Sequence, residues 1–379
     1  MDFRTICVHG SDKRYDVTGA VSVPIFQSAT FAHPGVNRST GYDYSRTQNP
    51  TREYLEAAIA RLEGGSDALA FSSGMAAVAL VMELFSPGDH IIASDDLYGG
   101  SIRLFANPSA ARGLKFTYSD AYDAASLASA LTPATKALFI ETPSNPMMHV
   151  VDIAAAAEFA SAHGLLLVVD NTFMTPYFQR PLELGADIVI HSGTKYLCGH
   201  NDTLCGFAVV KDAGLSERLR FLFKTIGPCL APFDSWLLIR SLKTLALRME
   251  AQQSNARELA EWLLTQPKIK AVHYPGLPEH PQYDISRRQA SGFGAMLSFS
   301  ADTPETAVGI LERVRLILYA ESLGGVESLI TYPMLQTHAD IPEAEREAKG
   351  IDGCLLRLSV GIESPDDLIA DLDHAINGR

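Results

Sequence analysis

The chain has 379 residues, of which 47% are hydrophobic and 20% are charged, and its formal net charge is −13. This composition is typical of a globular protein with a large core and two domains, and the acidic balance argues against nucleic acid or an anionic membrane as a partner. The five cysteines are scattered without a CxxC pair, so neither a disulfide framework nor a metal site is expected. The chain shows no apolar leader and no apolar run of bilayer length, which predicts a cytoplasmic protein.

Residues 1–48 precede the first regular pattern of the chain and are predicted to form an arm. Val21–Phe26 has the pattern of a short strand, and proline and glycine residues interrupt the segment after it. An arm of this length without a core of its own is expected to lie on another surface. By spacing alone, Tyr44 and Arg46 near its end are residues of a solvated turn.

Strands and helices alternate from residue 49 to residue 235, and this segment is predicted to be the large domain. A helix begins at Pro50 and ends at Gly64. The predicted strands are continuous apolar runs at 68–71, 90–93, 136–140, 165–169 and 186–190. Continuous apolar strands that alternate with helices are typical of an α/β fold whose mostly parallel sheet is covered on both faces.

Residues 236–379 are predicted to form a smaller α+β domain that begins with a long linking helix. The helical pattern runs from Phe233 almost without interruption to Gln266. Beyond it, strands are expected at 293–299 and 355–360, and helices at 304–316 and 366–376.

Polar residues directly follow several of the predicted strands. Tyr98, Asn145, Asp170 and Lys195 all lie just beyond strand ends, where the side chains of an open α/β sheet converge on a ligand crevice. The turn Ser72–Ala77 joins a strand to a helix N-terminus, whose free N–H groups and dipole favour a phosphate. Neither GxGxxG nor GxxxxGK is present, which argues against a dinucleotide fingerprint or a Walker loop.

These residue types together provide what an enzyme that uses pyridoxal 5'-phosphate requires from its protein. Lys195 can form a Schiff base with the cofactor aldehyde, Asp170 can hold the pyridine nitrogen protonated, and Tyr98 can stack on the ring. The phosphate would be held by Gly74, Met75, Ser192 and Thr194. Each residue also has an ordinary structural explanation, as a helix cap, a packing residue or a turn former, and only their coincidence at strand ends favours the cofactor.

Longer motifs in the same order extend this set over nearly the whole chain. They are Tyr44-Ser45-Arg46, Asn49-Pro50-Thr51, Ser72-Ser73-Gly74-Met75-Ala76-Ala77, Tyr98-Gly99-Gly100, Glu141-Thr142-Pro143-Ser144-Asn145-Pro146, Val169-Asp170-Asn171-Thr172-Phe173, His191-Ser192-Gly193-Thr194-Lys195-Tyr196, Glu321-Ser322-Leu323-Gly324-Gly325-Val326-Glu327-Ser328 and Leu356-Arg357-Leu358-Ser359-Val360-Gly361. With them the chain resembles the Cys/Met metabolism family of pyridoxal-phosphate enzymes, which carry out trans-sulfuration. One departure is Gly193, where the family usually has alanine, and we expect it to leave the role of the lysine intact.

The resemblance implies fold type I, a homotetramer built from two tight dimers, and small amino-acid substrates. It implies that Tyr44 and Arg46 reach the cofactor phosphate of a neighbouring subunit, whereas Gly74, Met75, Ser192 and Thr194 bind it within the subunit. Arg357 matches the residue that grips the substrate α-carboxylate, with help from Ser322 and Asn145, and Asn145 also faces the cofactor ring oxygen. Lys195 is implied to move the substrate protons, with Tyr98 as a candidate acid for the departing group.

A few positions distinguish the members of the family. Glu321 matches a glutamate of cystathionine γ-synthases and γ-lyases, and Gly100 argues against methionine γ-lyase, which typically has cysteine there. The runs Ile330–Pro333 and Thr337–Pro342 look most like bacterial cystathionine γ-synthases. The resemblance therefore favours synthesis of cystathionine from an O-acylhomoserine and cysteine, with γ-lyase activity possible beside it.

The alternatives within the family are cystathionine γ-lyase, then cystathionine β-lyase or methionine γ-lyase. From another class, the alternative is an inactive binding protein that kept the fold, although the intact Lys195, Asp170, Tyr98 and Arg357 argue against it. A nicotinamide-dependent dehydrogenase is disfavoured by the missing glycine fingerprint.

Overall fold

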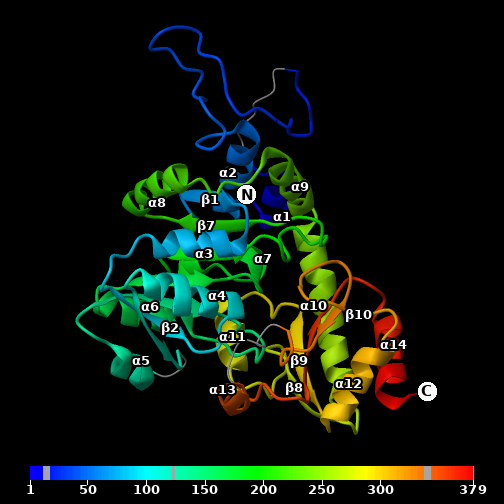
Figure 1. The fold of residues 1–379 in the computed structure, drawn as a ribbon. Coiled ribbons are helices and arrows are strands. Elements are labelled where there is room, and N and C mark those ends of the chain that lie inside the picture. The colour runs from blue at the N-terminus through cyan, green and yellow to red at the C-terminus, as the bar shows by residue number, and fades with distance from the viewer. Residues whose placement is uncertain (12–17, 122–123, 337–342, 379) are drawn as a thin grey trace.

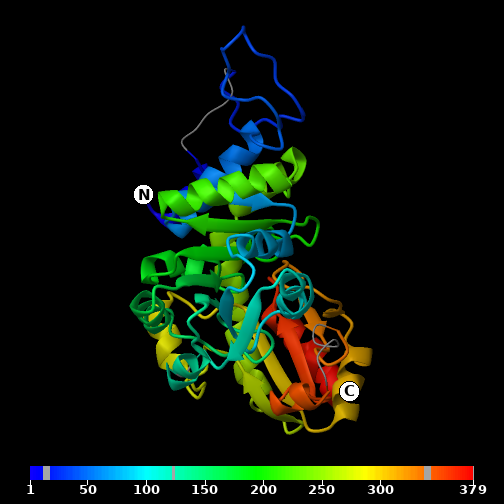
Figure 2. The same ribbon diagram turned by 60° about the vertical axis from the view of Figure 1, so that its left-hand side comes forward.

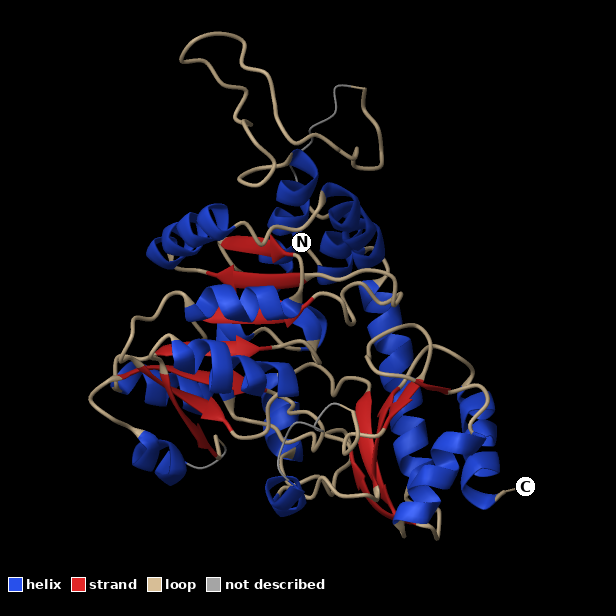
Figure 3. Cartoon of the chain, viewed as in Figure 1, coloured by secondary structure: helices blue, strands red, loops and turns tan. Residues whose placement is uncertain are grey.

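Two β-sheets organise the chain, whose computed structural model describes residues 1–11, 18–121, 124–336 and 343–378. The seven-stranded sheet contains β1 (Asp67–Phe71), β2 (His90–Ser94), β3 (Lys115–Ser119), β4 (Thr135–Glu141), β5 (Leu166–Asp170), β6 (Ile188–Ser192) and β7 (Gly206–Val210), in the order β1-β7-β6-β5-β4-β2-β3. The five-stranded sheet contains β8 (Ile269–His273), β9 (Met296–Ala301), β10 (Leu318–Tyr319), β11 (Leu329–Thr331) and β12 (Leu355–Ser359), in the order β10-β11-β12-β9-β8. Figure 3 shows the two sheets as separate groups of strands.

The helices lie around and between these sheets (Figure 1). They are α1 (Phe3–His9), α2 (Pro50–Glu63), α3 (Gly74–Met82), α4 (Gly99–Leu104), α5 (Ala124–Ala130), α6 (Ile153–Ala162), α7 (Thr175–Phe178), α8 (Ala213–Ile226), α9 (Pro232–Leu242), α10 (Leu245–Leu263), α11 (Tyr283–Gln289), α12 (Pro304–Arg313), α13 (Glu343–Ala348) and α14 (Pro365–Asn377), with a π-helix at Phe105–Ser109 and a 3₁₀ helix at Pro181–Leu184. Among the described residues, no helix is long and apolar enough to cross a membrane.

The large sheet is mostly parallel, as the apolar strand pattern predicts. β2, β3, β4, β5 and β6 pair in parallel, and β7 runs against both of its neighbours, β1 and β6. Both faces are apolar: Val168 and Ile190 pack in one core cluster, and Val169 and Val189 pack in the other. Helices α3 and α8 lie on one side and α2 and α6 on the other. This α/β architecture leaves the carboxyl edge of the parallel strands as the place for a site.

The sequence did not indicate β3 and β7, and the predicted strand at Val21–Phe26 is wrong. Residues 21–26 form no strand; they run along the N-terminus of α2, where Thr51 Oγ1 donates to the carbonyl of Pro24 at 2.9 Å and accepts from the N–H of Phe26 at 2.9 Å. Because residues 21–26 pair with no neighbouring strand, side chains form hydrogen bonds with their backbone groups instead.

Two further expectations need correction. The first residues of the predicted arm form the short helix α1, in which Ile6 and Cys7 are buried against the body. The long linking helix is two helices, because the chain breaks between α9 and α10 at Lys243–Thr244. Residues 18–48 of the arm extend away from the body above α2 (Figure 2). The domain limits at 48/49 and 235/236 stay predictions.

Candidate active site

Lys195 lies three residues beyond the end of β6, at the carboxyl edge of the large sheet. Its Nζ donates a hydrogen bond of 2.8 Å to Ser322 Oγ, which comes from the C-terminal part of the chain. Burial, together with the nearby Arg357 guanidinium, lowers the pKa of Lys195 to about 8, against the opposing influence of Glu321. A much larger share of this amine is therefore neutral near pH 7 than for an exposed lysine.

Ser322 has an unusual backbone conformation, with φ at +108°. A residue with a side chain rarely adopts this region, and strain of this kind is often found at functional sites. The conformation lets Ser322 serve two partners: its hydroxyl accepts from Lys195, and its carbonyl accepts from Arg357 Nη2 at 2.9 Å.

Asp170 is the last residue of β5, and its carboxylate faces the same crevice. Its Oδ1 accepts from the N–H of Thr172 at 3.0 Å and from the Thr172 hydroxyl at 2.5 Å. Burial nevertheless raises the pKa of Asp170. A cation placed against this carboxylate would favour its ionised form, which is the condition a protonated pyridine nitrogen would provide.

The N-terminus of α3 lies where the sequence predicts an anion cup. Ser73 caps the helix by accepting from the N–H of Ala76, so the N–H groups of Gly74 and Met75 have no partner within the helix. A Cβ at position 74 would lie 2.9 Å from the Cβ of Ser192, so glycine is required where the helix meets the end of β6. The contact brings the helix N-terminus and the Ser192 hydroxyl to one point.

Tyr98 comes from the loop after β2 and is held by its backbone. Its N–H donates to Glu141 Oε2 at 2.9 Å, and its side chain is 43% exposed at the crevice. A Cβ at position 100 would lie 2.4 Å from Tyr98 Cε1, so the ring position in this chain depends on Gly100. The absence of a side chain at position 100 is therefore a packing requirement here.

Arg357, on β12, is 2% exposed and lies opposite the sheet edge. Its Nη1 donates to Asn145 Oδ1 at 2.9 Å, and Nη2 donates to the Thr331 hydroxyl at 3.1 Å as well as to Ser322. Burial lowers the pKa of Arg357 to about 10, against the favourable influence of nearby Tyr196, Glu141 and Glu321. The guanidinium thus remains a fixed buried cation.

One cavity of about 340 Å³ collects most of the predicted site residues. Its walls include Gly74, Met75, Tyr98, Asn145, Asp170, Ser192, Thr194, Lys195, Glu321, Ser322 and Arg357. Tyr44 and Arg46 are not among its walls. They lie in the arm, where Arg46 Nη1 donates to the carbonyl of Lys224 and its guanidinium lies 5.5 Å from the centre of the Tyr44 ring.

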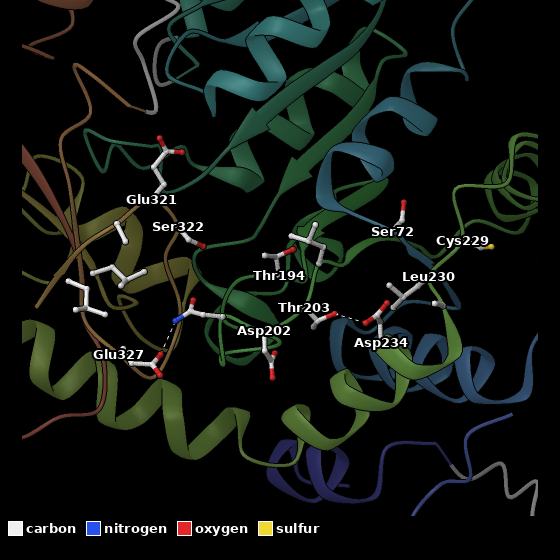
Figure 4. Close-up of a pocket in the computed structure, with 16 residues that line it drawn as sticks. Ser72, Thr194, Asp202, Thr203, Cys229, Leu230, Asp234, Glu321, Ser322 and Glu327 are labelled. Carbon is white, nitrogen blue, oxygen red and sulfur yellow. Dashed lines mark hydrogen bonds between the residues drawn. The ribbon is translucent and has the colours of Figure 1, made fainter. Parts of the chain in front are cut away.

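A second, more open cavity of about 960 Å³ adjoins the first. Thr194, Leu204, Glu321 and Ser322 line both cavities, so they form the neck between them. Figure 4 shows Glu321 and Ser322 on one side of the second cavity, and Cys229 and Asp234 on the other. Carboxylates dominate the charge of its walls, since Asp202, Asp234, Glu321 and Glu327 all line it.

Sequence reasoning missed Glu141, Thr172 and Thr331 as members of the site. Glu141 and Thr172 follow the same rule that identified Asp170, because both lie at the ends of neighbouring strands. Thr331 had no comparable signal, since it reaches Arg357 only through the pairing of β11 with β12. The run 337–342, whose sequence resembles that of bacterial cystathionine γ-synthases, lies outside the described residues.

Comparison with known proteins agrees with this geometry. The family described as "Cys/Met metabolism PLP-dependent enzyme" matches residues 4–377. The chain belongs to this family. It is 53% identical over 361 residues to cystathionine γ-synthase/O-acetylhomoserine (thiol)-lyase of Bacillus subtilis, covering 95% of this chain and 92% of the relative.

Other relatives in the family carry other activities. Cystathionine β-lyase of Coxiella burnetii is 50% identical over 378 residues, covering 98% of this chain and 97% of the relative. The crystal structure of cystathionine γ-lyase from Lactobacillus plantarum, complexed with L-serine, superposes with a TM-score of 0.96 at 47% identity over 100% of this chain and 99% of that chain. The family thus fixes the enzyme class, a pyridoxal-phosphate-dependent lyase or synthase of cysteine and methionine metabolism, and leaves the individual reaction open.

The residues present fit the family's cofactor, pyridoxal 5'-phosphate. The cavity combines a half-buried amine of lowered pKa, a half-buried carboxylate and a helix N-terminus with uncommitted N–H groups. Gly193 also fits its place, since a Cβ there would lie 2.7 Å from Phe207 Cε2 and 3.0 Å from Cys205 Sγ. A side chain at position 193 would therefore require Phe207 or Cys205 to move.

Proposed function

We propose that the protein is a cystathionine γ-synthase, which joins the sulfur of L-cysteine to the γ-carbon of an O-acylhomoserine. Glu321 carries this proposal, because it lines both the cofactor cavity and the larger cavity that opens beside it. A carboxylate at this neck can attract the ammonium group of incoming cysteine, or that of the distal end of cystathionine. The name of the B. subtilis relative, a γ-synthase, supports the same reading.

Several residues would hold the cofactor. Gly74 and Met75 would bind its phosphate through their N–H groups, Ser192 and Thr194 through their hydroxyls, and Asp170 its ring nitrogen. Tyr98 would cover the ring, and Asn145 would face the ring oxygen. When bound, the cofactor supplies an aldehyde for amino groups and an electron-withdrawing ring that stabilises negative charge at the substrate α-carbon.

Lys195 would move the protons of the reaction. Its lowered pKa leaves a neutral amine that would take the α-proton of the substrate, pass that proton to the bound cofactor, and so become free to take a β-proton. Cleavage of the bond between the γ-carbon and its oxygen would release the acyloxy group as a carboxylic acid, with Tyr98 as the acid that protonates it. The cysteine thiol would then give up its proton and its sulfur would bond to the γ-carbon. The Ser322 hydroxyl would hold the Lys195 amine when it is not engaged.

Arg357 would bind the substrate α-carboxylate. Its guanidinium is already fixed by Asn145, Ser322 and Thr331, so little side-chain entropy remains to be lost when a carboxylate binds. Its buried Nε has no hydrogen-bond partner among the described residues, so this N–H would be available to a carboxylate. The substrate would then lie between the sheet edge that carries Lys195 and the strand that carries Arg357.

Product analysis in two mixtures tests this proposal. The first contains the holoenzyme, an O-acetyl- or O-succinylhomoserine and L-cysteine, and the second contains the holoenzyme and cystathionine alone. If cystathionine forms at a higher rate than 2-oxobutyrate or pyruvate is released, the result supports the synthase. Release of mainly 2-oxobutyrate from cystathionine would assign a γ-lyase. Release of mainly pyruvate would assign a β-lyase and contradict the role proposed for Glu321.

We also propose that the arm, residues 1–48, completes the site of a second copy in a homotetramer. Within the described chain, Tyr44 and Arg46 lie outside the cavity of their own subunit. Arg46→Ala and Lys195→Ala should each be inactive alone, but subunits mixed under dissociating conditions should regain part of the activity. In a mixed dimer, one site has both an intact lysine and an intact arm. Absence of any recovery in verified hetero-oligomers would contradict the proposal.

A further inference from the structure

Glu141 is a buried acid at the centre of the cavity wall that none of the roles above uses. It is the last residue of β4, is 6% exposed and lines the cavity. In the parallel pairing of β4 with β5, Glu141 stands directly beside Asp170. Neighbours in register point to the same face of a sheet, so the two carboxyl groups lie on the same face, and both line the cavity.

The two carboxyl groups have unequal support. Asp170 accepts two hydrogen bonds from Thr172, and His191 favours its charged form. Within the described chain, Glu141 accepts one hydrogen bond, from the backbone N–H of Tyr98. When two buried acids are close together, the one with fewer donors keeps its proton.

The charged groups that face Glu141 from other elements strengthen this inequality. Asp170 on β5 and Asp96 in the loop after β2 oppose its ionisation, and Arg357 on β12 favours it. Burial is the largest influence, and the net result raises the pKa of Glu141 well above its usual range. Arg357 is already committed to Asn145, Ser322 and Thr331 and forms no salt bridge to Glu141 in the described chain.

We propose that Glu141 is a positioning residue that works as a neutral carboxylic acid: it fixes Tyr98 through the backbone N–H and leaves Asp170 as the carboxylate facing the cofactor ring. An ionised Glu141 would place a second negative charge beside Asp170 and raise the energy of the charged Asp170. The proton on Glu141 therefore protects the charge of Asp170. This inference rests on the roles given above to Asp170 and Tyr98, but not on which family reaction the enzyme performs.

The anchored segment supports a positioning role. Tyr98 follows Asp96, whose carboxylate accepts from the Ser144 hydroxyl, and the N–H of Glu141 donates to Ser94 Oγ at 3.3 Å. The loop that carries Tyr98 is thus attached to the end of β4 at several points, and Glu141 makes the attachment at Tyr98 itself. Loss of its side chain would free the backbone at the residue that covers the cofactor ring.

The test compares Glu141→Gln with Glu141→Ala and uses cofactor binding as its first readout. Glutamine reproduces a neutral carboxylic acid, since its carbonyl can accept from Tyr98 and its amide can donate. We expect Glu141→Ala to weaken pyridoxal-phosphate binding by the apoenzyme about tenfold, the loss of a hydrogen bond and its geometry, and Glu141→Gln to weaken it less than about threefold. Glu158→Gln, an exposed glutamate on α6, is the matched control.

The pH dependence of cofactor affinity separates this role from a purely structural one. In the wild type, ionisation of Glu141 at alkaline pH should weaken cofactor binding, because the second negative charge raises the energy of the charged Asp170 that faces the ring. Glu141→Gln should lack that alkaline loss, whereas Glu158→Gln should keep it. The absorption spectrum of the bound cofactor, followed over the same pH range, should show the same difference.

An infrared difference spectrum between apo wild type and apo Glu141→Gln gives a direct view of the proton. A protonated carboxyl band that is present in the wild type and absent in the variant supports the proposal. Cofactor affinity that falls as much in Glu141→Gln as in Glu141→Ala, or an ionised carboxylate band for Glu141 at neutral pH, would overturn the proposal. Because these readouts need no amino-acid substrate, they remain valid if the enzyme proves to be a lyase instead of a synthase.

Discussion

The cavity has two walls of different construction. One wall is the carboxyl edge of the large sheet, where Asp170 and Ser192 end adjacent parallel strands and Lys195 follows the second of them. The other wall comes from the second sheet and consists of single side chains, chiefly Ser322 on a loop and Arg357 on β12. The first wall contains an amine and a carboxyl group whose pKa values are shifted, and the second contains a buried guanidinium and a hydroxyl on a strained backbone.

This difference suggests a division of work between the walls. Repeated strand ends place several polar groups within reach of one ligand, which suits a cofactor with a ring and a phosphate. Two hydrogen bonds cross the cavity, Lys195 to Ser322 and Arg357 to Asn145. We therefore expect substitutions on the sheet edge to affect the cofactor and the chemical step, and substitutions on the facing wall to affect substrate binding.

Lys195→Ala should give the largest effect. A positioned acid–base group contributes about 10²–10⁴-fold to a rate, and this lysine would also attach the cofactor. We expect kcat to fall by at least about 10³-fold, measured as cystathionine formation with saturating cofactor. Loss of substrate affinity with kcat unchanged would contradict the division between the walls.

Asp170→Asn should come next and should act through the cofactor. A neutral amide cannot hold the ring nitrogen protonated, and a hydrogen bond to a charged group contributes about 1.5–3 kcal/mol. We expect kcat to fall roughly 10- to 100-fold, together with a changed absorption spectrum of the bound cofactor. Thr172→Ala, which removes the hydroxyl donor to Asp170, should show the same spectral change to a smaller degree.

Arg357→Lys should act on the other wall. The ammonium group keeps the charge but cannot reproduce the paired N–H groups of a guanidinium. We expect KM for the amino-acid substrate to rise about tenfold or more, while the affinity for pyridoxal phosphate stays within about twofold. A large loss of cofactor affinity with an unchanged KM would show that the two walls do not divide the work in this way.

The smallest effect concerns the stability of the apoenzyme as pH changes. The pKa of Lys195 is lowered to about 8 in the folded chain and should lie near 10.4 when unfolded. Between these values the unfolded chain binds more protons, so the contribution of Lys195 to the free energy of unfolding should increase with pH. Urea denaturation of apo wild type and apo Lys195→Met should show the wild type gaining relative stability across that window. A constant difference would contradict the lowered pKa.

The sequence by itself determined the class of fold and most of the sheet edge. Continuous apolar runs identified β1, β2, β4, β5 and β6, because a strand buried on both faces cannot alternate with polar residues. Residues that come directly after such strands must reach the same edge, which is why the sequence alone groups Tyr98, Asn145, Asp170 and Lys195.

Only the tertiary structure decided which residues meet across the two sheets. The pairing of Lys195 with Ser322 spans 127 positions, and that of Arg357 with Asn145 spans 212. A local sequence pattern cannot predict contacts between residues so far apart in the chain. The motifs placed these residues in one site only through the resemblance to a family. The proximity of Glu141 to Asp170 likewise depends on strand register, which side-chain packing sets after the sheet has assembled.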